Sequence, residues 1–313
     1  MFAYTVRRIL MTIPVMLVVA LFVYALLELA PGDPAVFLAG DDATAEDIER
    51  IRSTLGLDRP FVERFVLWLF QVARGDLGVS LFTGVPVAQM IVQRIPSTFT
   101  LMLMTLVVSV LVAIPVGALA AWYHNRLEDR LVMVGAVFSF SLPTFVVGYA
   151  LAWLFGVELQ LLPVQGYVPL SEGLWASLRT LILPTLALAS VYVALITRIT
   201  RATLLETLSQ DYIRTARAKG VDSRNVLFRH ALRNAAVPIV TVIGSGVALL
   251  ISGAVVTETV FSIPGLGRLT VDAILRRDYP IIQGVILLFS LLYVLINLIV
   301  DLLYRVFDPR ITY

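Results

Sequence analysis

Residues 211–220 read Asp-Tyr-Ile-Arg-Thr-Ala-Arg-Ala-Lys-Gly and lie between two long apolar segments, 180–200 and 236–257. The surrounding stretch 198–233 contains eight Arg or Lys residues and only three Asp or Glu residues. A basic connection between two membrane helices belongs on the cytoplasmic side. Because this connection is also amphipathic, we expect a short surface helix that ends at Gly220. A helix shaped in this way and displayed to the cytoplasm is expected to dock a partner.

The composition places the chain among integral membrane proteins. Hydrophobic residues make up 59% of the chain, charged residues make up 15%, and the mean hydropathy is +0.89. A soluble domain would have about 45–50% apolar and about 25% charged residues. The net charge is only +2, and no aromatic-basic module is present, so we expect no nucleic-acid partner. The absence of cysteine excludes disulfides and thiolate metal sites, and no metal site is expected.

Six segments have the roughly 20 apolar residues that a membrane-spanning helix requires. They are 9–30, 98–121, 131–156, 180–200, 236–257 and 281–304. Arginines in the short connections and near both ends place the N-terminus, the even-numbered connections and the C-terminus in the cytoplasm. The sequence therefore predicts an all-α, polytopic membrane bundle of about six transmembrane helices.

Three regions follow from this topology. Residues 1–97 form the first span and a long extracytoplasmic loop. Residues 98–305 form the core transmembrane domain, which contains the cytoplasmic segment 201–235, and residues 306–313 form a cytoplasmic tail. The apolar stretch at the N-terminus is longer than the core of a signal peptide, so we interpret it as a retained helix.

Two outer loops carry local signals. In the first, we expect a helix over 43–55 capped by Thr44, and a second helix after Arg59-Pro60. The second helix has one apolar side, with which it lies at the membrane surface, packs on the outer ends of the spans, or does both. In the loop 258–280, the stretch 263–267 (Ile-Pro-Gly-Leu-Gly) predicts tight turns rather than helix.

The sequence shows no motif for ATP binding, for an internal proton relay or for a catalytic serine. A nucleotide-binding P-loop needs a lysine followed by Ser or Thr, but Lys219 is the sole lysine and Gly220 follows it. The carboxylates of the spans lie near the span ends, so the sequence offers no internal proton relay of the kind that ion-driven carriers use. No Gly-x-Ser-x-Gly elbow occurs either. We therefore expect a chain that is not an enzyme, and any ATP would be hydrolysed by another polypeptide.

Hydroxyl and small residues interrupt two of the predicted spans. Small residues let helices approach closely, and hydroxyl groups can line a wet path. The sequence does not say which of the two roles each residue has. The candidates for a substrate path are Ser139, Ser141, Thr144, Ser245 and Ser252.

The basic segment, together with residues 228–235 (Phe-Arg-His-Ala-Leu-Arg-Asn-Ala) and Pro238, resembles the coupling segment of ABC importer permeases of the peptide-importer branch. The match extends over nearly the whole chain in family order. The further matching stretches are Pro31-Gly32-Asp33-Pro34, Leu55-Gly56-Leu57-Asp58-Arg59-Pro60, Gly75-Asp76-Leu77-Gly78-Val79-Ser80, Glu258-Thr259-Val260-Phe261, Ile263-Pro264-Gly265-Leu266-Gly267, Arg277-Asp278-Tyr279-Pro280 and Asp308-Pro309-Arg310. The general permease motif begins with Glu-Ala-Ala, and of positions 214–216 only Ala216 fits it.

This resemblance implies the fold of a type I ABC importer permease in the bacterial cytoplasmic membrane. It implies a second, similar permease subunit in a heterodimer, two ATP-binding subunits that hold ATP and magnesium, and an extracytoplasmic solute-binding protein. The chain itself would bind no cofactor. The coupling residues would be Asp211, Tyr212, Ile213, Arg214, Thr215, Ala216, Arg217, Ala218, Lys219 and Gly220. In this reading Tyr212 and Ile213 fill an apolar notch on the ATPase, and Arg214, Arg217 and Lys219 pair with its acidic groups.

The function that follows is translocation of peptides, powered by the partner ATPases. The alternative is a self-sufficient secondary carrier or channel. The branch also carries nickel, glutathione, opines and some oligosaccharides, so the resemblance leaves the solute open. Besides the protein partners and the peptide, the expected surroundings of the chain are membrane lipids.

Overall fold

The structure is a computed structural model that describes residues 2–29, 34–39, 43–54 and 56–307. The motif residues 31–33 and 308–310, and the tail from residue 308, lie outside this part. The chain groups into two compact units, which we describe separately. Unit 1 comprises residues 1–95 and 269–294, and unit 2 comprises residues 96–268 and 295–313. The predicted division at residue 97 did not anticipate that 269–294 would group with the N-terminal residues.

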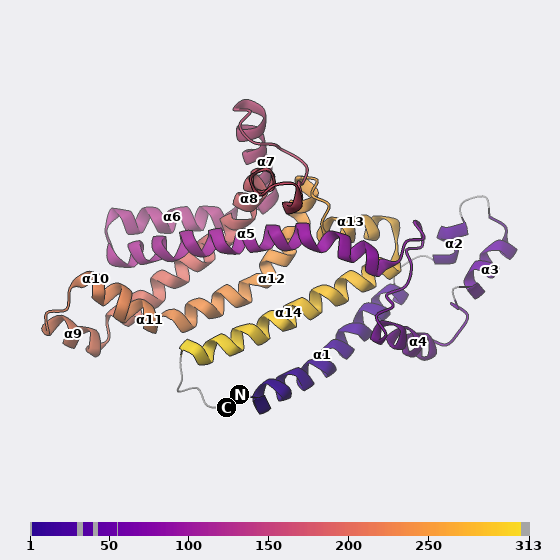
Figure 1. Ribbon diagram of the computed structural model, residues 1–313, viewed down its shortest axis with the longest axis horizontal. Helices are drawn as coiled ribbons and strands as arrows, with labels where there is room; N and C mark the ends of the chain where they lie inside the picture. Colours follow the sequence, from indigo (N-terminus) through magenta and orange to yellow (C-terminus); the bar gives the residue numbers. More distant parts are fainter. Residues whose placement is uncertain (1, 30–33, 40–42, 55, 308–313) are drawn as a thin grey trace. The chain divides into compact units, whose positions relative to one another are not determined.

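The regular elements in the described part are helices (Figure 1). They are α1 (Phe2–Leu29), α2 (Pro34–Ala39), α3 (Ala45–Thr54), α4 (Phe61–Ala73), α5 (Val87–Trp122), α6 (Leu127–Ser141), α7 (Thr144–Leu151), α8 (Leu174–Leu208), α9 (Asp211–Ala218), α10 (Ser223–Asn225), α11 (Leu232–Asn234), α12 (Ala236–Val260), α13 (Leu266–Arg276) and α14 (Tyr279–Phe307), with π-helical stretches at Ala152–Glu158 (η1) and Val226–Ala231 (η3) and a 3₁₀ turn at Leu170–Glu172 (η2).

Each of the six predicted spans falls on a helix, or on the bent pair formed by α6 and the α7–η1 stretch. By length and composition, four helices of the described part can cross a membrane, namely α5, α8, α12 and Tyr279–Asp301 of α14. The bent pair makes a fifth if it is one span, and α1 contributes a shorter apolar stretch, Leu10–Ala25. Helices α5 and α8 extend well beyond the predicted apolar windows, because packing and backbone hydrogen bonds continue a helix after its residues cease to be apolar.

The third predicted span is broken. Helix α6 ends where Leu142 adopts an extended backbone (φ −89°, ψ 127°), and α7 begins after Pro143 at an angle of 101° to α6. Proline has no N–H to continue the helical ladder, and it disfavours the helical conformation in the residue before it. The segment 131–156, predicted from the sequence as one span, is therefore sharply bent at Pro143.

In unit 1, the predicted outer-loop helices are confirmed. Thr44 caps α3, because its hydroxyl accepts a hydrogen bond from the Asp47 N–H at 3.3 Å and donates to the Asp47 carboxylate at 2.6 Å. The hydrogen bonds from Thr44 lower the pKa of the Asp47 carboxyl below its ordinary value. On α4, the rings of Phe61, Phe65 and Trp68 lie 5.1–5.6 Å from the ring of Tyr24 on α1. The apolar side of α4 therefore packs on the first span.

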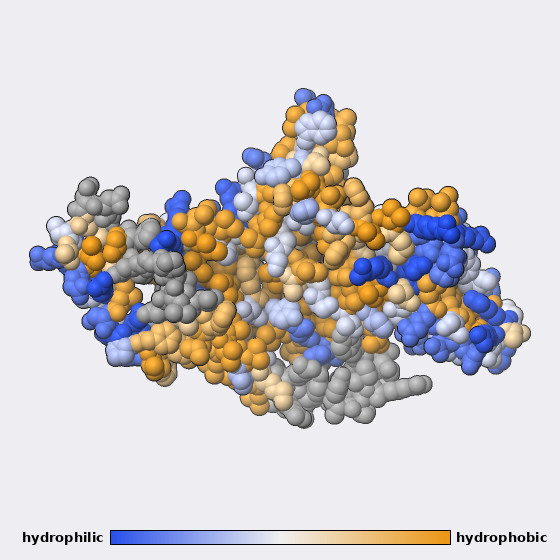
Figure 2. Space-filling view, turned by 180° about the vertical axis from the view of Figure 1, so that it is seen from behind, coloured by the Kyte–Doolittle hydropathy of each residue, from blue (hydrophilic) through white to orange (hydrophobic). Residues whose placement is uncertain are grey.

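In unit 2, α8 is the central helix, and it packs against α6, α7 and α12. The large buried side chains of its core include Leu101, Leu181, Tyr192 and Leu250, from α5, α8 and α12. Figure 2 shows apolar residues as broad areas of the surface, as expected for helices that face lipid or partner chains.

A buried carboxylate holds the turn after α12. Glu258 is fully buried; it accepts hydrogen bonds from the Thr98 hydroxyl at 2.6 Å and from the Arg268 N–H at 3.0 Å. A Cβ on Gly265 or Gly267 would lie 2.2–2.9 Å from this carboxylate, so the glycines permit the close approach. The predicted turns occupy residues 261–265, but the chain becomes helical at Leu266, because its N–H is satisfied by Thr98 and the next turns pack as α13.

Candidate functional site

Helix α9 is the predicted short surface helix, and it spans eight residues, Asp211–Ala218. It ends in a Schellman motif, in which the Val221 N–H donates to the Ala216 carbonyl (3.1 Å) and the Gly220 N–H donates to the Arg217 carbonyl (2.9 Å). Gly220 has a φ of +79°, which side chains other than hydrogen rarely tolerate. The expected end of the helix at Gly220 is therefore confirmed.

One side of α9 is fixed to the rest of unit 2. Ile213 is fully buried in a cluster that combines side chains of α5, α8, η3 and α12. The buried members around it are Ala118, Ala121, Leu204, Val226, Leu227, Ala231, Ala235 and Ile239. The expectation that Ile213 fills a notch on a partner is corrected here, because its side chain has no surface left to offer. We name this cluster, with α9 to α11 around it, the docking lobe.

The other side of α9 is displayed. Tyr212 is 42% exposed, and Arg214, Arg217 and Lys219 are exposed. The remaining predicted residues are exposed at Asp211, Thr215 and Ala218 and half-buried at Ala216. Arg214 lies 3.4 Å from Asp211, an exposed pair one turn apart that contributes little to stability. In Figure 2, hydrophilic residues gather at the end of unit 2 that carries the docking lobe and the α5–α6 turn.

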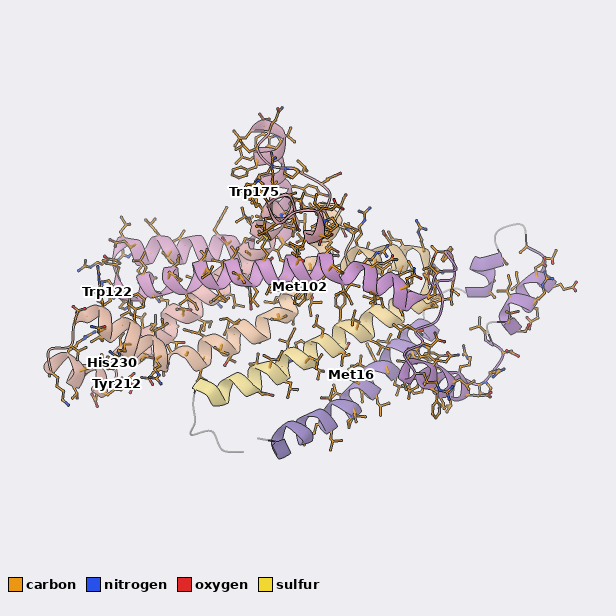
Figure 3. The ribbon with its side chains drawn as sticks, viewed as in Figure 1. Met16, Met102, Trp122, Trp175, Tyr212 and His230 are labelled. Atoms are coloured by element: carbon orange, nitrogen blue, oxygen red, sulfur yellow. The ribbon has the colours of Figure 1, made fainter. Side chains whose placement is uncertain are left out.

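A second contact orients Tyr212. The Asn234 side-chain amide of α11 donates to the Tyr212 hydroxyl at 2.8 Å and to the His230 carbonyl at 2.9 Å. Figure 3 shows Tyr212 and His230 at the same end of unit 2. The basic stretch after Gly220, which the sequence placed in the same coupling segment, thus folds back and supports α9 directly.

A charged cluster that sequence reasoning missed lies next to the docking lobe. Arg201 of α8 makes a two-pronged ion pair with Asp129 at the start of α6, with its Nη2 at 2.7 Å from Oδ2. Asp129 has a side chain only 4% exposed, and it also accepts the Asn125 N–H at 3.0 Å. His124 Nδ1 lies 3.2 Å from Arg201. The cluster ties the α5–α6 turn to α8, ten residues before α9 begins.

The sequence contained a signal for this pair. A carboxylate at the start of one apolar span and a guanidinium at the end of another are both costly to bury alone, so their pairing could have been proposed. What the sequence could not supply is which of several arginines comes close to Asp129. The partners of Glu258 could not be predicted from the sequence either. This carboxylate holds the turn before α13 through a hydroxyl and a backbone N–H rather than through a charged group.

The predicted substrate-path residues fall into two groups. In the first, Ser139 and Thr144 are half-buried and Ser141 is exposed at the bend between α6 and α7. The Ser141 hydroxyl donates to the Val137 carbonyl at 2.8 Å, within its own helix. The second group lies on α12, and within the described ranges no hydrogen bond joins the two groups.

Helix α12 separates its small residues from its hydroxyl residues. Ser245 and Ser252 are exposed, and with Thr241 and Thr259 they follow a spacing of four and seven residues along one face. The close contacts of α12 with neighbouring side chains are made at its glycines. A Cβ on Gly246 would lie 2.1 Å from the Tyr192 ring, and one on Gly244 would meet Val300 at the same distance. Close packing therefore applies to the glycines of this helix, and a wet path along its exposed hydroxyl residues stays a prediction.

Comparisons with known proteins show the family of the chain. Residues 113–313 match the family described as binding-protein-dependent transport system inner membrane component, and residues 1–102 match the N-terminal region of such membrane components. The chain is 50% identical to a probable peptide ABC transporter permease protein of Sinorhizobium fredii over 99% of both chains. It is 42% identical to the glutathione transport system permease protein of Escherichia coli over the full length of both.

A solved structure shares the fold. The MetNI methionine ABC transporter in inward-facing conformations includes a chain that superimposes with a TM-score of 0.57 at 16% sequence identity. The likeness covers 70% of this chain and 97% of that chain. At this level of identity, the comparison supports the fold alone.

Proposed function

Since this chain belongs to the family of binding-protein-dependent transport system inner membrane components, we propose that it is the translocation subunit for peptides in an ATP-driven importer. The relatives named above are a peptide permease and a glutathione permease, and glutathione is itself a small peptide. Family membership supports this function over a self-sufficient carrier or channel. Nickel, opines and oligosaccharides remain alternative solutes, which purification of the intact complex with the ligand of its binding protein would distinguish.

The observation that carries the proposal is the two-sided burial of α9. Ile213 anchors the helix in the core of unit 2, while Tyr212, Arg217 and Lys219 face outward. A partner that pulls on the outward face therefore also moves α5, α8 and α12 through the buried cluster. Such a rigid connection is what a subunit needs if an ATPase is to switch it between two states.

The partners of the proposed complex follow from the family. They are ATPase subunits, two in number, that bind ATP and magnesium, an extracytoplasmic solute-binding protein, and a second permease in a heterodimer. This chain itself would not hydrolyse ATP. The concentration of basic residues in 198–233 supports an orientation with the docking lobe and both termini in the cytoplasm.

The solute path is proposed along the exposed hydroxyl face of α12. Ser245, Ser252 and Thr241 give an otherwise apolar helix a polar stripe, and hydroxyl groups of this kind can line a wet path. The residues at the α6–α7 bend, Ser141 and Thr144, form a second candidate lining. A path with hydroxyl and small apolar walls suits extended peptides of varied side chain.

The test of docking is a pair of exposed substitutions in α9, Tyr212→Ala with Arg217→Ala. In the reconstituted complex, we expect peptide uptake to fall at least tenfold while the variant chain is made and assembled in the membrane at normal levels. Arg130→Ala, which removes another exposed arginine, is the matched control and should leave uptake unchanged. Uptake and ATP hydrolysis at the unsubstituted level in the α9 variant would contradict docking at this helix.

A further inference from the structure

A cavity of about 390 Å³ lies within unit 1, and the proposed transport function does not use it. Its volume is within the range of small-ligand sites. Two of the stretches that carry the family resemblance contribute to its wall through residues 56–59 and 279–280, and Leu81 directly follows a third stretch, 75–80. The lining residues that the argument uses are Tyr24, Arg59, Arg64, Trp68, Tyr279 and Gln283.

The wall next to α14 is built by buried polar contacts. The Ser80 hydroxyl donates to the Asp278 carboxylate at 2.5 Å, and the Leu81 N–H donates to the same carboxylate at 3.3 Å. Both Ser80 and Asp278 are 3% exposed. These bonds hold the stretch 75–81 against the start of α14, so Leu81 and Tyr279 line the cavity from fixed positions.

Gln283 presents a polar group to the cavity. Its side chain lines the cavity and is only 9% exposed. Within the part of the chain that the structure describes, no hydrogen bond to its amide is found, and the amide atoms are not among the fully enclosed polar atoms that lack a partner. The amide is therefore open to a ligand in the cavity, to which it could donate or from which it could accept a hydrogen bond.

The charge of the lining favours an anion. Arg59 and Arg64 line the cavity, and no acidic residue is among the described residues that line it. Arg59 also lies 3.4 Å from Glu63, but that pair is exposed and weak. The Nε of Arg64 donates to the Arg59 carbonyl at 3.1 Å, which holds the two arginines together. Guanidinium groups bind phosphate and carboxylate oxygens with charge-assisted hydrogen bonds. Because the described lining offers an ammonium group no carboxylate, it suits an anion better than a free peptide.

The position of the cavity favours a lipid. Tyr24 lies near the end of α1 and Tyr279 begins α14, so the lining includes the ends of two apolar helices. Tyr and Trp at such ends mark the membrane–water interface. On α1, Leu21 and Leu17 lie one and two turns before Tyr24 on the same side, and they are 45% and 43% exposed. They offer an apolar track that leads away from the cavity.

We propose that this cavity binds the phosphate head of an anionic phospholipid, such as phosphatidylglycerol, with an acyl chain along Leu21 and Leu17. Arg59 and Arg64 pair with the phosphate, Gln283 hydrogen-bonds to the head, and Trp68 and Tyr24 pack on the glycerol region. The proposal holds whichever solute the subunit carries.

The experiment uses the full-length chain in its complex, in nanodiscs of phosphatidylcholine that contain a small fraction of phosphatidylglycerol with a photoreactive acyl chain. Mass spectrometry locates the labelled peptides. We expect labelling of residues 17–24, and a loss of roughly tenfold in a variant with both Arg59→Gln and Gln283→Leu. Arg74→Gln removes an arginine of the same unit that does not line the cavity, and its labelling should stay within twofold of the original.

Competition in the unsubstituted protein gives a readout that needs no variant. Unlabelled phosphatidylglycerol should displace the probe, whereas added phosphatidylcholine, inorganic phosphate and a free tripeptide should not. Equal displacement by phosphatidylcholine would overturn the proposal, and displacement by the tripeptide would assign the cavity to peptide instead. Gln283→Glu keeps the side-chain size but repels phosphate, so unchanged labelling in that variant would also overturn it.

Discussion

Ile213→Ala is the perturbation that separates the anchoring of α9 from its docking face. Ile213 is the one buried residue among Asp211–Ala218, and it is 0% exposed. Truncation of a fully buried isoleucine costs about 2–5 kcal/mol, from the lost transfer free energy and from the cavity left behind. The hydrogen bond between Tyr212 and Asn234 contributes about 1 kcal/mol, which is too little to compensate.

A helix of eight residues is not stable by itself in water. The loss of about 3 kcal/mol should therefore appear as local opening of α9 rather than as unfolding of the long helices. Since 1.4 kcal/mol is a factor of ten, the fraction of time that α9 is open should rise roughly a hundredfold. Peptide uptake should fall with it, because a detached helix no longer moves the core of unit 2.

The assay is hydrogen exchange measured by mass spectrometry on the purified complex. We expect faster exchange over residues 211–220 and unchanged exchange over 187–197 in the middle of α8. Arg217→Ala is the matched control on the same helix, where loss of an exposed side chain costs about 0.5 kcal/mol or less. Exchange at 211–220 within threefold of the original in Ile213→Ala, or an equal increase in both peptides, would refute the reasoning.

Three further substitutions test the packing of unit 2. Asp129→Asn and Arg201→Gln should each destabilise the protein by about 3 kcal/mol, because each removes the ionic partner of a buried or half-buried charge. The double variant should cost less than the sum of the two single losses, and strictly additive losses of thermal stability would contradict the ion pair. Gly267→Ala should destabilise by roughly 1–3 kcal/mol, because the new Cβ would lie 2.5 Å from the Cα of Val255. Gly135→Ala has no atom within 4 Å of the new Cβ, so an equal shift of the melting temperature in both variants would argue against this account.

Local signals in the sequence predicted the helices and many of their ends. The apolar windows predicted the long helices, Thr44 predicted the start of α3, and Gly220 predicted the end of α9. The break at Pro143 in the third span follows from an equally local rule, although the span was predicted as one helix. Each of these follows from rules that act within a few residues, such as the missing N–H of proline or the positive φ of glycine. The helix at Leu266–Arg276 was missed because its start depends on a distant hydroxyl.

The candidate site was predicted in its extent but not in its orientation. In the sequence-based prediction, Tyr212 and Ile213 lie together on the docking face. In the structure Ile213 is buried, whereas the Tyr212 side chain is exposed. Two neighbouring apolar residues on a short helix look equivalent in sequence. Only the arrangement of α5, α8 and α12 around them decides which one enters the core.

Length, composition and turn chemistry are local properties, so the order of amino acids was enough to predict a helical membrane bundle with a basic connecting helix. The meeting of distant groups, such as Ser80 with Asp278, Asp129 with Arg201, and Thr98 with Glu258, became visible only in the folded chain. Helices that are apolar on every side have no sequence pattern that marks the buried face. Their contacts are selected by the shape of the neighbours and by the need to pair each buried polar group.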